Sequence, residues 1–191
     1  MLIKTVFAGF GGQGVLSMGL NLAQAAMIEG KHVTYLPSYG VEVRGGTANC
    51  TVAISDEEIA SPVASSPEFI VVMSQPSLAK FQNQVESGGA LLYNSSLVTA
   101  DIPRGDIELL GVPATRMAEE IGNPRGANMV MLGAFIKKTN LVSMDTIFET
   151  LKETFKTKTK LIATNKKALM AGYDFAVPKR PGEASTRSAA G

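Results

Sequence analysis

The motif Gly9-Phe10-Gly11-Gly12-Gln13-Gly14 follows the apolar run 2–8 and opens a helical pattern over 14–29. This order predicts a strand, a tight glycine turn and a helix. Glycines let the backbone turn sharply and approach a ligand closely, and the unpaired N–H groups of a helix N-terminus attract anions. We therefore expect the turn to bind a phosphate group. The alternative is that the glycines only allow a strand to pack against a helix.

Two common nucleotide-binding motifs do not fit the residues around this turn. A dinucleotide site needs an acidic residue roughly 20 positions beyond the glycines, at the end of the second strand. Here the second strand, 32–36, ends in Pro37-Ser38-Tyr39 without a carboxylate. A P-loop needs Gly-Lys-Ser or Gly-Lys-Thr, whereas this chain has Gln13-Gly14-Val15. A bound dinucleotide would therefore lack its usual ribose anchor.

The composition is that of one globular domain. The chain has 191 residues, of which 45% are hydrophobic and 18% charged, with a formal net charge of +1. This balance removes the main electrostatic argument for nucleic acid or an anionic membrane as partner. No apolar run approaches the roughly 20 residues that span a bilayer, and no signal-peptide pattern is present, so we expect a cytoplasmic protein. We predict one domain over 1–177 and a polar tail over 178–191 that is disordered or folds onto a partner.

Cysteine and histidine each occur once. Cys50 alone cannot form an internal disulfide, an iron–sulfur cluster or a cysteine-rich zinc site, and His32 has no second histidine with which to share a metal. Cys50 lies in the strand-like run 47–54, so we expect a small buried hydrophobe, against the alternative of a redox or nucleophilic role. His32 begins a strand and is expected at a turn edge or at the surface. We predict no metal site and no catalytic side chain in this chain.

Apolar strand-like runs alternate with helical patterns, which is typical of an α/β sheet with crossover helices. We expect a single-domain, Rossmann-like open sheet that is mostly parallel. The expected strands are 2–8, 32–36, 47–54, 69–73, 90–93 and 107–110. The expected helices are 14–29, one that starts at Pro76, 113–121, 128–138, 143–155 with Ser143 as its cap, and a last one capped by Thr159. The apolar helix 129–136 is expected to pack closely, in the core or against another subunit.

The segment 37–46 is a second glycine-rich connection that follows an N-terminal strand. In an open α/β sheet such a connection emerges at the carboxyl edge, beside the first glycine turn. Tyr39 offers a flat apolar face with a hydroxyl, and Arg44 offers a planar charged fork for phosphate. Gly45 and Gly46 offer a backbone that a ligand or another subunit can approach. The alternative is an ordinary surface loop.

Three segments together resemble a known family. They are the turn 9–14, then Pro37-Ser38-Tyr39-Gly40-Val41-Glu42-Val43-Arg44-Gly45-Gly46-Thr47-Ala48-Asn49-Cys50, then Asn128-Met129-Val130-Met131-Leu132-Gly133-Ala134. From about residue 2 to about residue 175 the chain is similar to the gamma subunit of 2-oxoacid:ferredoxin oxidoreductases, of the 2-oxoglutarate or 2-ketoisovalerate type. The form Arg-Gly-Gly-Thr-Ala-Asn-Cys resembles the 2-oxoglutarate type more than the pyruvate or indolepyruvate types.

The resemblance implies that this chain is one subunit of a larger enzyme. Members of the family oxidatively decarboxylate a 2-oxoacid, reduce ferredoxin and transfer the acyl group to coenzyme A. By resemblance, alpha and beta subunits, and a delta subunit in some members, hold thiamine diphosphate with Mg²⁺ and the 4Fe-4S clusters. The role left for this chain is to bind or position coenzyme A, so the isolated chain is expected to be inactive. The residues predicted to contact the coenzyme are Gly9, Gly11, Gly12, Gln13, Gly14, Ser38, Tyr39, Arg44, Gly45 and Gly46.

Two alternatives of other classes remain open from the sequence. In the first, the same loops only bury themselves against another subunit, and the chain is a scaffold without a ligand. In the second, the chain is a stand-alone nucleotide-binding oxidoreductase. The missing ribose acid and the absence of a catalytic histidine or Lys–Tyr arrangement argue against the second alternative.

Overall fold

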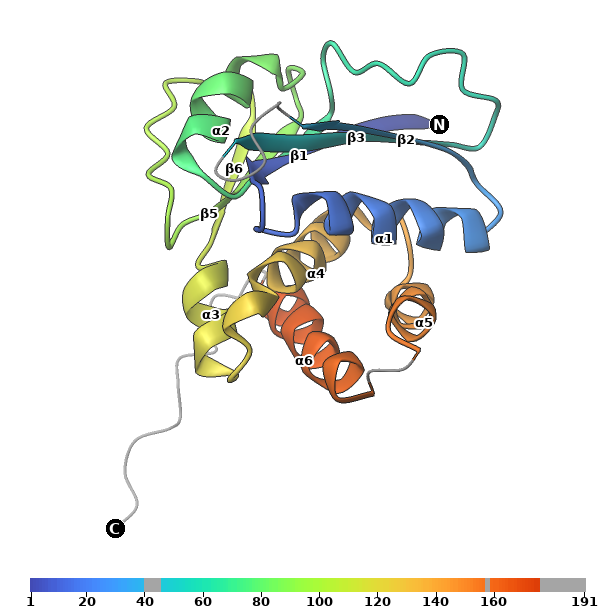
Figure 1. The fold of residues 1–191 in the computed structure, drawn as a ribbon. Coiled ribbons are helices and arrows are strands. Elements are labelled where there is room, and N and C mark those ends of the chain that lie inside the picture. Colours follow the sequence, from blue (N-terminus) through green and yellow to red (C-terminus); the bar gives the residue numbers. More distant parts are fainter. Residues whose placement is uncertain (40–45, 157–158, 176–191) are drawn as a thin grey trace, which may run out of the picture.

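The computed structural model describes residues 1–39, 46–156 and 159–175. One six-stranded sheet runs through this part of the chain in the order β2-β3-β1-β4-β5-β6. Helices cover both faces of the sheet, most of them on one face (Figure 1). The predicted tail 178–191, and the predicted site residues Arg44 and Gly45, lie outside the described residues. The prediction of a Rossmann-like α/β fold is confirmed.

The strands on one side of the sheet are parallel, and one antiparallel strand is inserted on the other side. Strand β1 (Leu2–Phe10) pairs in parallel with β4 (Phe69–Val72). In the same way, β4 pairs with β5 (Ala90–Asn94), and β5 pairs with β6 (Glu108–Val112). Strand β3 (Thr47–Ser55) is antiparallel to both β1 and β2 (His32–Tyr39), and it separates them. Strand β2 therefore runs parallel to β1, and both end at the same edge of the sheet.

Alternate residues of β1 face two separate hydrophobic cores, as the period of two in a strand requires. Phe7 belongs to the larger core, which lies under α1 (Val15–Ile28) and α4 (Ala127–Thr139). Val6 and Ala8 belong to the smaller core under α2 (Gln75–Phe81), on the opposite face (Figure 1). Because both faces are covered, β1 and β4 read as nearly continuous apolar runs in the sequence.

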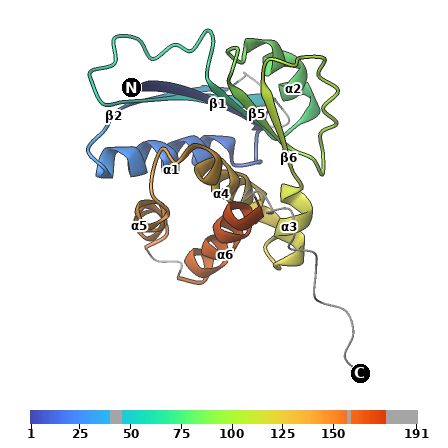
Figure 2. The same cartoon turned by 180° about the vertical axis from the view of Figure 1, so that it is seen from behind.

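The remaining helices add a second layer beneath the larger core (Figures 1 and 2). They are α3 (Ala114–Glu120), α5 (Met144–Thr154) and α6 (Thr159–Phe175). Ser143 caps α5 as predicted, because its hydroxyl accepts a hydrogen bond of 3.1 Å from the Thr146 N–H. All helices and strands lie within a few residues of their predicted ranges. Strands β1 and β2 extend beyond them, to Phe10 and Tyr39, because β3 pairs with both over their whole length.

The predicted close packing of the apolar helix 129–136 is confirmed, and it is core packing. Every residue from Met129 to Ile136 is buried. A Cβ atom added at Gly133 would collide with the backbone carbonyl of Leu169, and one added at Gly172 with the carbonyl of Val130. Helices α4 and α6 therefore touch backbone to backbone, and the alternative role of 129–136 as a subunit contact is wrong.

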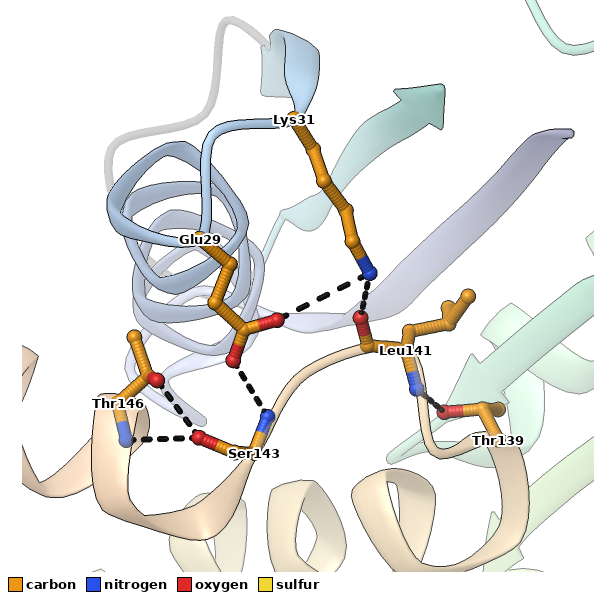
Figure 3. A network of polar contacts seen from close by, with 6 residues as sticks. All are labelled: Glu29, Lys31, Thr139, Leu141, Ser143 and Thr146. Atoms are coloured by element: carbon orange, nitrogen blue, oxygen red, sulfur yellow. Dashed lines mark hydrogen bonds and ion pairs between the residues drawn. The ribbon is translucent and has the colours of Figure 1, made fainter. Parts of the chain in front are cut away.

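A polar network joins the end of α1 to the connection between α4 and α5 (Figure 3). The Glu29 carboxylate accepts a hydrogen bond of 2.7 Å from the Ser143 N–H, and it lies 3.8 Å from the Lys31 ammonium. Lys31 also donates to the Leu141 carbonyl. Burial alone would raise the pKa of Glu29. The hydrogen bonds from Ser143 and Thr146 and the charge of Lys31 outweigh burial, so the pKa lies below its ordinary value.

Glu29→Gln is expected to lower the free energy of unfolding by about 1 kcal/mol at neutral pH. A carboxylate with a depressed pKa stabilises the fold above its unfolded pKa, and this contribution disappears as the pH falls through its folded pKa. The difference between wild type and variant should therefore shrink between pH ~5 and pH ~3, in denaturant titrations followed by circular dichroism. Asp101→Asn is the control, because Asp101 is exposed and has no partner among the described residues. If the free energies of unfolding of wild type and Glu29→Gln differ by the same amount at every pH, the ionic role of Glu29 is contradicted.

Candidate functional site

The glycine turn after β1 requires glycine at three positions for steric reasons. A Cβ atom at Gly9 would lie 2.6 Å from Gln13 Oε1 and 2.8 Å from Val15 Cγ1. Gly12 and Gly14 have φ angles of 95° and 73°, in the left-handed region that disfavours other residues. Gly14 is also the residue that precedes the first turn of α1. The turn therefore aims the N-terminus of α1 at the carboxyl edge of the sheet.

Gln13 closes the turn through its side chain. Its Oε1 accepts a hydrogen bond of 2.7 Å from the Phe10 N–H, and its Nε2 donates at 3.0 Å to the Met73 carbonyl. Sequence reasoning placed Gln13 in contact with a ligand. In the structure both ends of the amide tie the turn to the ends of β1 and β4, so Gln13 first of all holds the turn in shape.

The predicted proximity of the two glycine segments is confirmed at one contact. The Gly11 N–H donates a hydrogen bond of 3.1 Å to the Gly46 carbonyl, just before β3 begins. Ser38 pairs with Asn49, and Asn49 with Ala8. Two strand spacings, about 10 Å, thus separate Ser38 from β1. The structure does not bring Ser38 up to the turn, and the side chain of Tyr39 and residues 40–45 lie outside its description.

A cleft of about 410 Å³ lies on the other side of the turn, and of the predicted site residues Gly12 and Gln13 line it. It is bounded by the turn, by the ends of β4 and β5, and by the starts of α3 and α4. The residues that matter for its chemistry are Gly12, Gln13, Asn94, Thr115, Arg125 and Asn128. Such a position, outside the carboxyl ends of neighbouring parallel strands, is where open α/β sheets bind ligands.

Arg125 is the charged side chain among the described residues that line this cleft. It lies on the short 3-10 helix η2 (Pro124–Gly126), directly before α4. The side chain is exposed and makes no hydrogen bond or ion pair with any described residue. Sequence reasoning treated 122–126 only as a break between helices. The available signal was an arginine in a Gly- and Pro-containing break that opens directly into a strongly apolar helix.

The N-termini of α1 and α4 meet at the cleft. Asn128, in the first turn of α4, donates a hydrogen bond of 3.4 Å to the Gly14 carbonyl. A Cβ atom at Gly14 would collide with the Asn128 amide, so this contact also requires glycine. Neither helix carries an acidic residue in its first turn. The positive ends of both helix dipoles and the Arg125 guanidinium therefore favour an anion at this place.

Cys50 and His32 take no part in this site. The side chain of Cys50 is fully buried against α1, and its burial raises the pKa of the thiol to about 12. The thiol therefore stays neutral at physiological pH, which confirms the prediction of a buried hydrophobe. His32 lies exposed at the start of β2, also as predicted. Within the described residues no group of three or more His, Cys, Asp or Glu side chains could hold a metal ion, and no helix is long and apolar enough to cross a membrane.

Comparison with known proteins supports the resemblance stated above. Residues 4–175 match the family described as "Pyruvate ferredoxin/flavodoxin oxidoreductase". The chain belongs to this family. Two curated relatives in it are the ketoisovalerate oxidoreductase subunit VorA of Methanothermobacter thermautotrophicus, 44% identical, and the 2-oxoglutarate synthase subunit KorC of Methanocaldococcus jannaschii, 37% identical. The first match covers 95% of this chain and 38% of VorA, and the second covers 88% of this chain and 91% of KorC.

Two solved structures of the family share the fold. The gamma subunit of a keto/oxoacid ferredoxin oxidoreductase from Geobacter sulfurreducens PCA has a TM-score of 0.78 at 28% identity, over 91% of this chain and 98% of that subunit. The 2-oxoglutarate:ferredoxin oxidoreductase from Magnetococcus marinus, with 2-oxoglutarate, coenzyme A and succinyl-CoA bound, has a TM-score of 0.84 at 25% identity. That match covers 92% of this chain but 31% of the Magnetococcus chain. The chain thus spans about a third of the length of VorA and of the Magnetococcus protein.

Proposed function

We propose that the chain is the gamma subunit of a multi-subunit 2-oxoacid:ferredoxin oxidoreductase and that it holds the pyrophosphate of coenzyme A in the cleft beside the glycine turn. The observation that carries this proposal is the meeting of the α1 and α4 N-termini in one cleft with Arg125, which has no polar partner in the described part of the chain. The coenzyme A bound in the related Magnetococcus protein supports a coenzyme A site within such a complex.

The residues of the cleft fit a diphosphate. Backbone N–H groups at the start of each helix have no intrahelical acceptor and can donate to phosphate oxygens. Arg125 supplies a planar fork of N–H donors, and no lining residue among those described is acidic. The volume of about 410 Å³ is that of a small-ligand pocket, so the cleft would take part of the coenzyme and leave the rest outside.

The role of this chain in the reaction would be binding and positioning. Coenzyme A supplies the thiol that accepts the acyl group. The turn, Arg125 and the two helix N-termini would hold the far end of the coenzyme, which raises the effective concentration of that thiol beside the acyl group in a neighbouring subunit. Cys50, with its pKa near 12, is not available as a nucleophile. Thiamine diphosphate, Mg²⁺ and the 4Fe-4S clusters are proposed for the partner subunits.

We infer 2-oxoglutarate as the substrate of the complex, with 2-ketoisovalerate as the alternative. The segment Arg44–Cys50 supports the first substrate by its resemblance to the 2-oxoglutarate type. The names of the relatives support both substrates, since VorA is named a ketoisovalerate oxidoreductase subunit and KorC a 2-oxoglutarate synthase subunit. Reduction of ferredoxin by the assembled complex with each 2-oxoacid, in the presence of coenzyme A, distinguishes them. The cytoplasmic location stays a prediction from the sequence.

Calorimetry of coenzyme A binding to the assembled complex, with and without Arg125→Ala, tests the coenzyme A proposal. A complex that assembles and binds the coenzyme equally well in both forms would favour the scaffold alternative. The same experiment on the isolated chain shows whether partner subunits contribute further phosphate contacts.

The scaffold alternative is supported by an exposed apolar stripe on α1. Leu20, Met27 and Ile28 have 42%, 64% and 53% of their surface exposed, and the last two line a shallow groove of about 320 Å³ between α1 and α5. These residues lie on one face of the helix, with the exposed polar residue Gln24 between Leu20 and the other two. A stripe of this kind suits contact with an alpha or beta subunit, whether or not the chain also binds coenzyme A.

The double variant Met27→Asp, Ile28→Asp is expected to weaken association with the partner subunits at least tenfold. Each aspartate would have to lose its hydration in the interface, while the isolated chain keeps its fold because both positions are exposed. Analytical ultracentrifugation of mixed subunits measures the change. Val63→Asp is the control, since Val63 is apolar and 58% exposed but lies outside the stripe. Equal effects of the two substitutions would contradict an interface on α1.

A further inference from the structure

The outer edge of strand β6 has unpaired backbone groups. Strand β6 is the last strand in the order of the sheet and lies beside β5 (Figure 2). The Glu108 N–H donates a hydrogen bond of 2.9 Å to the Gly89 carbonyl, so Glu108 directs its backbone toward β5. Successive residues of a strand direct their backbone groups to opposite sides, so those of Leu109 and Gly111 point outward. No described residue bonds to them on that side.

The two edge strands of the sheet differ in their protection against further pairing. Natural edge strands are often protected by proline, by lysine or by a bulge. Strand β2 contains Pro37, which has no N–H group and so interrupts the row of donors. Strand β6 has the sequence Glu-Leu-Leu-Gly-Val, without proline or lysine, and its register with β5 has no bulge. Of the two edges, β6 is therefore the one to which another strand can be added.

The side chains of β6 are complementary to those of a second β6 strand. Leu109 projects from the edge with 37% of its surface exposed, whereas Gly111 has no side chain. A Cβ atom at Gly111 would lie 2.7 Å from the Tyr93 hydroxyl, so the Tyr93 side chain lies over this glycine. Gly111 pairs with Tyr93 in the sheet, and Leu109 lies two residues away, so all three share the face of the smaller core. The strand thus carries one protruding and one recessed position on the same face.

We propose that β6 pairs in the antiparallel direction with β6 of a second copy of this chain, about a two-fold axis at Leu110. Leu109 of one copy and Gly111 of the other then exchange their backbone hydrogen bonds. Each Leu109 packs over Gly111 and against Tyr93 of the other copy, as an isologous contact requires. The sheets of the two copies become continuous, and their carboxyl edges lie at opposite ends. This inference does not depend on the coenzyme A proposal.

Analytical ultracentrifugation of the full chain between about 1 μM and about 1 mM tests this pairing. The contact is short, because β6 has five residues, so a reversible dimer that grows with concentration is expected. Leu109→Lys should weaken the dimer at least tenfold, since the ammonium group would lose hydration against Gly111 and Tyr93 of the other copy. Leu36→Lys is the matched control, because Leu36 is 44% exposed and lies on the other edge strand. It should leave the dimer unchanged.

A disulfide across the two-fold axis tests the register. In the proposed pairing the two copies of Leu110 face each other without a hydrogen bond, with Cα atoms about 4.5 Å apart. This distance lies within the range of about 4.4–6.8 Å that a disulfide needs. Leu110→Cys should therefore form a covalent dimer on mild oxidation, and Leu36→Cys should form one much more slowly. Cys50 does not interfere, because its side chain is fully buried.

Three results would overturn the inference. The first is a chain that stays monomeric over the whole concentration range. The second is a dimer that Leu109→Lys and Leu36→Lys weaken equally, which would place the contact away from β6. The third is a covalent dimer that forms as fast from Leu36→Cys as from Leu110→Cys, which would show random collision in place of the proposed register. If the isolated chain is monomeric while the Leu109 and Gly111 amides exchange slowly with deuterium in the assembled complex, another subunit occupies this edge.

Discussion

Arg125→Ala is expected to weaken coenzyme A binding to the assembled complex roughly ten- to a hundredfold. The guanidinium makes no hydrogen bond or ion pair with a described residue, so its removal leaves no unpaired protein group behind. The expected loss is that of hydrogen bonds between charged partners, about 1.5–3 kcal/mol. Isothermal titration calorimetry measures the affinity. Ferredoxin reduction at saturating coenzyme A should stay near the wild-type rate, because Arg125 would bind the coenzyme without touching its thiol.

Two further variants make this experiment specific. Lys152→Ala removes one positive charge from exposed α5, away from the lining of the cleft, and should leave the affinity unchanged. Arg125→Lys keeps the charge and loses the planar fork, so an intermediate affinity is expected for a phosphate contact. Equal weakening by Arg125→Ala and Lys152→Ala would indicate a general effect of net charge, and would remove Arg125 from the site.

Arg44→Ala addresses the part of the site that was predicted from sequence. Arg44 precedes Gly46 by two residues in the sequence, and the Gly46 carbonyl accepts a hydrogen bond from Gly11 of the turn, whereas Arg125 lines the cleft beside Gly12. If both arginines bind phosphate groups of the same coenzyme, the double variant should lose more affinity than either single variant. An unchanged affinity for Arg44→Ala, with a loss for Arg125→Ala, would place the coenzyme in the cleft on the α4 side alone.

The glycine turn could be predicted from sequence because the constraints that require its glycines are mostly local, although Gly14 also contacts the distant Asn128. Gly9, Gly12 and Gly14 are required by residues within a few positions, or by backbone angles that only glycine adopts easily. Arg125 could not be placed beside this turn in the same way. It is brought there by the pairing of β1 with β4 and by the docking of α4, across more than a hundred residues of sequence. A single sequence carries no direct signal of that contact.

The inserted strand β3 shows the same division between local and distant information. Its alternation and its turn residues predict a strand over 47–54, and the structure has one over Thr47–Ser55. Its position between β1 and β2 depends on pairing across the sheet, and that pairing places Ser38 about 10 Å from β1. Among the predicted contact residues whose side chains the structure describes, Ser38 is therefore separated from the turn by the fold.

Gly133→Ala is expected to destabilise the isolated chain by about 2–4 kcal/mol. The added methyl group would meet the backbone carbonyl of Leu169, which cannot rotate away as a side chain would. Helices α4 and α6 must then separate. Overpacking typically costs about 1–3 kcal/mol, and we expect a cost above that range here because the collision is with backbone atoms; helix propensity returns at most about 1 kcal/mol of it. Because α4 also carries Asn128 to the turn, the variant should lose coenzyme A affinity as well as stability.

Gly105→Ala is the matched control for this substitution. No atom lies within 4 Å of a Cβ atom at Gly105, and its φ angle is not in the left-handed region. Its midpoint of thermal unfolding should stay within a degree or two of wild type, whereas that of Gly133→Ala should fall by roughly 5–15 °C. Equal midpoints for the two variants would mean that α4 and α6 can move apart without cost. In that case Asn128 and Arg125 would not be held rigidly at the cleft, and the preorganised phosphate site proposed for this chain would lose its structural basis.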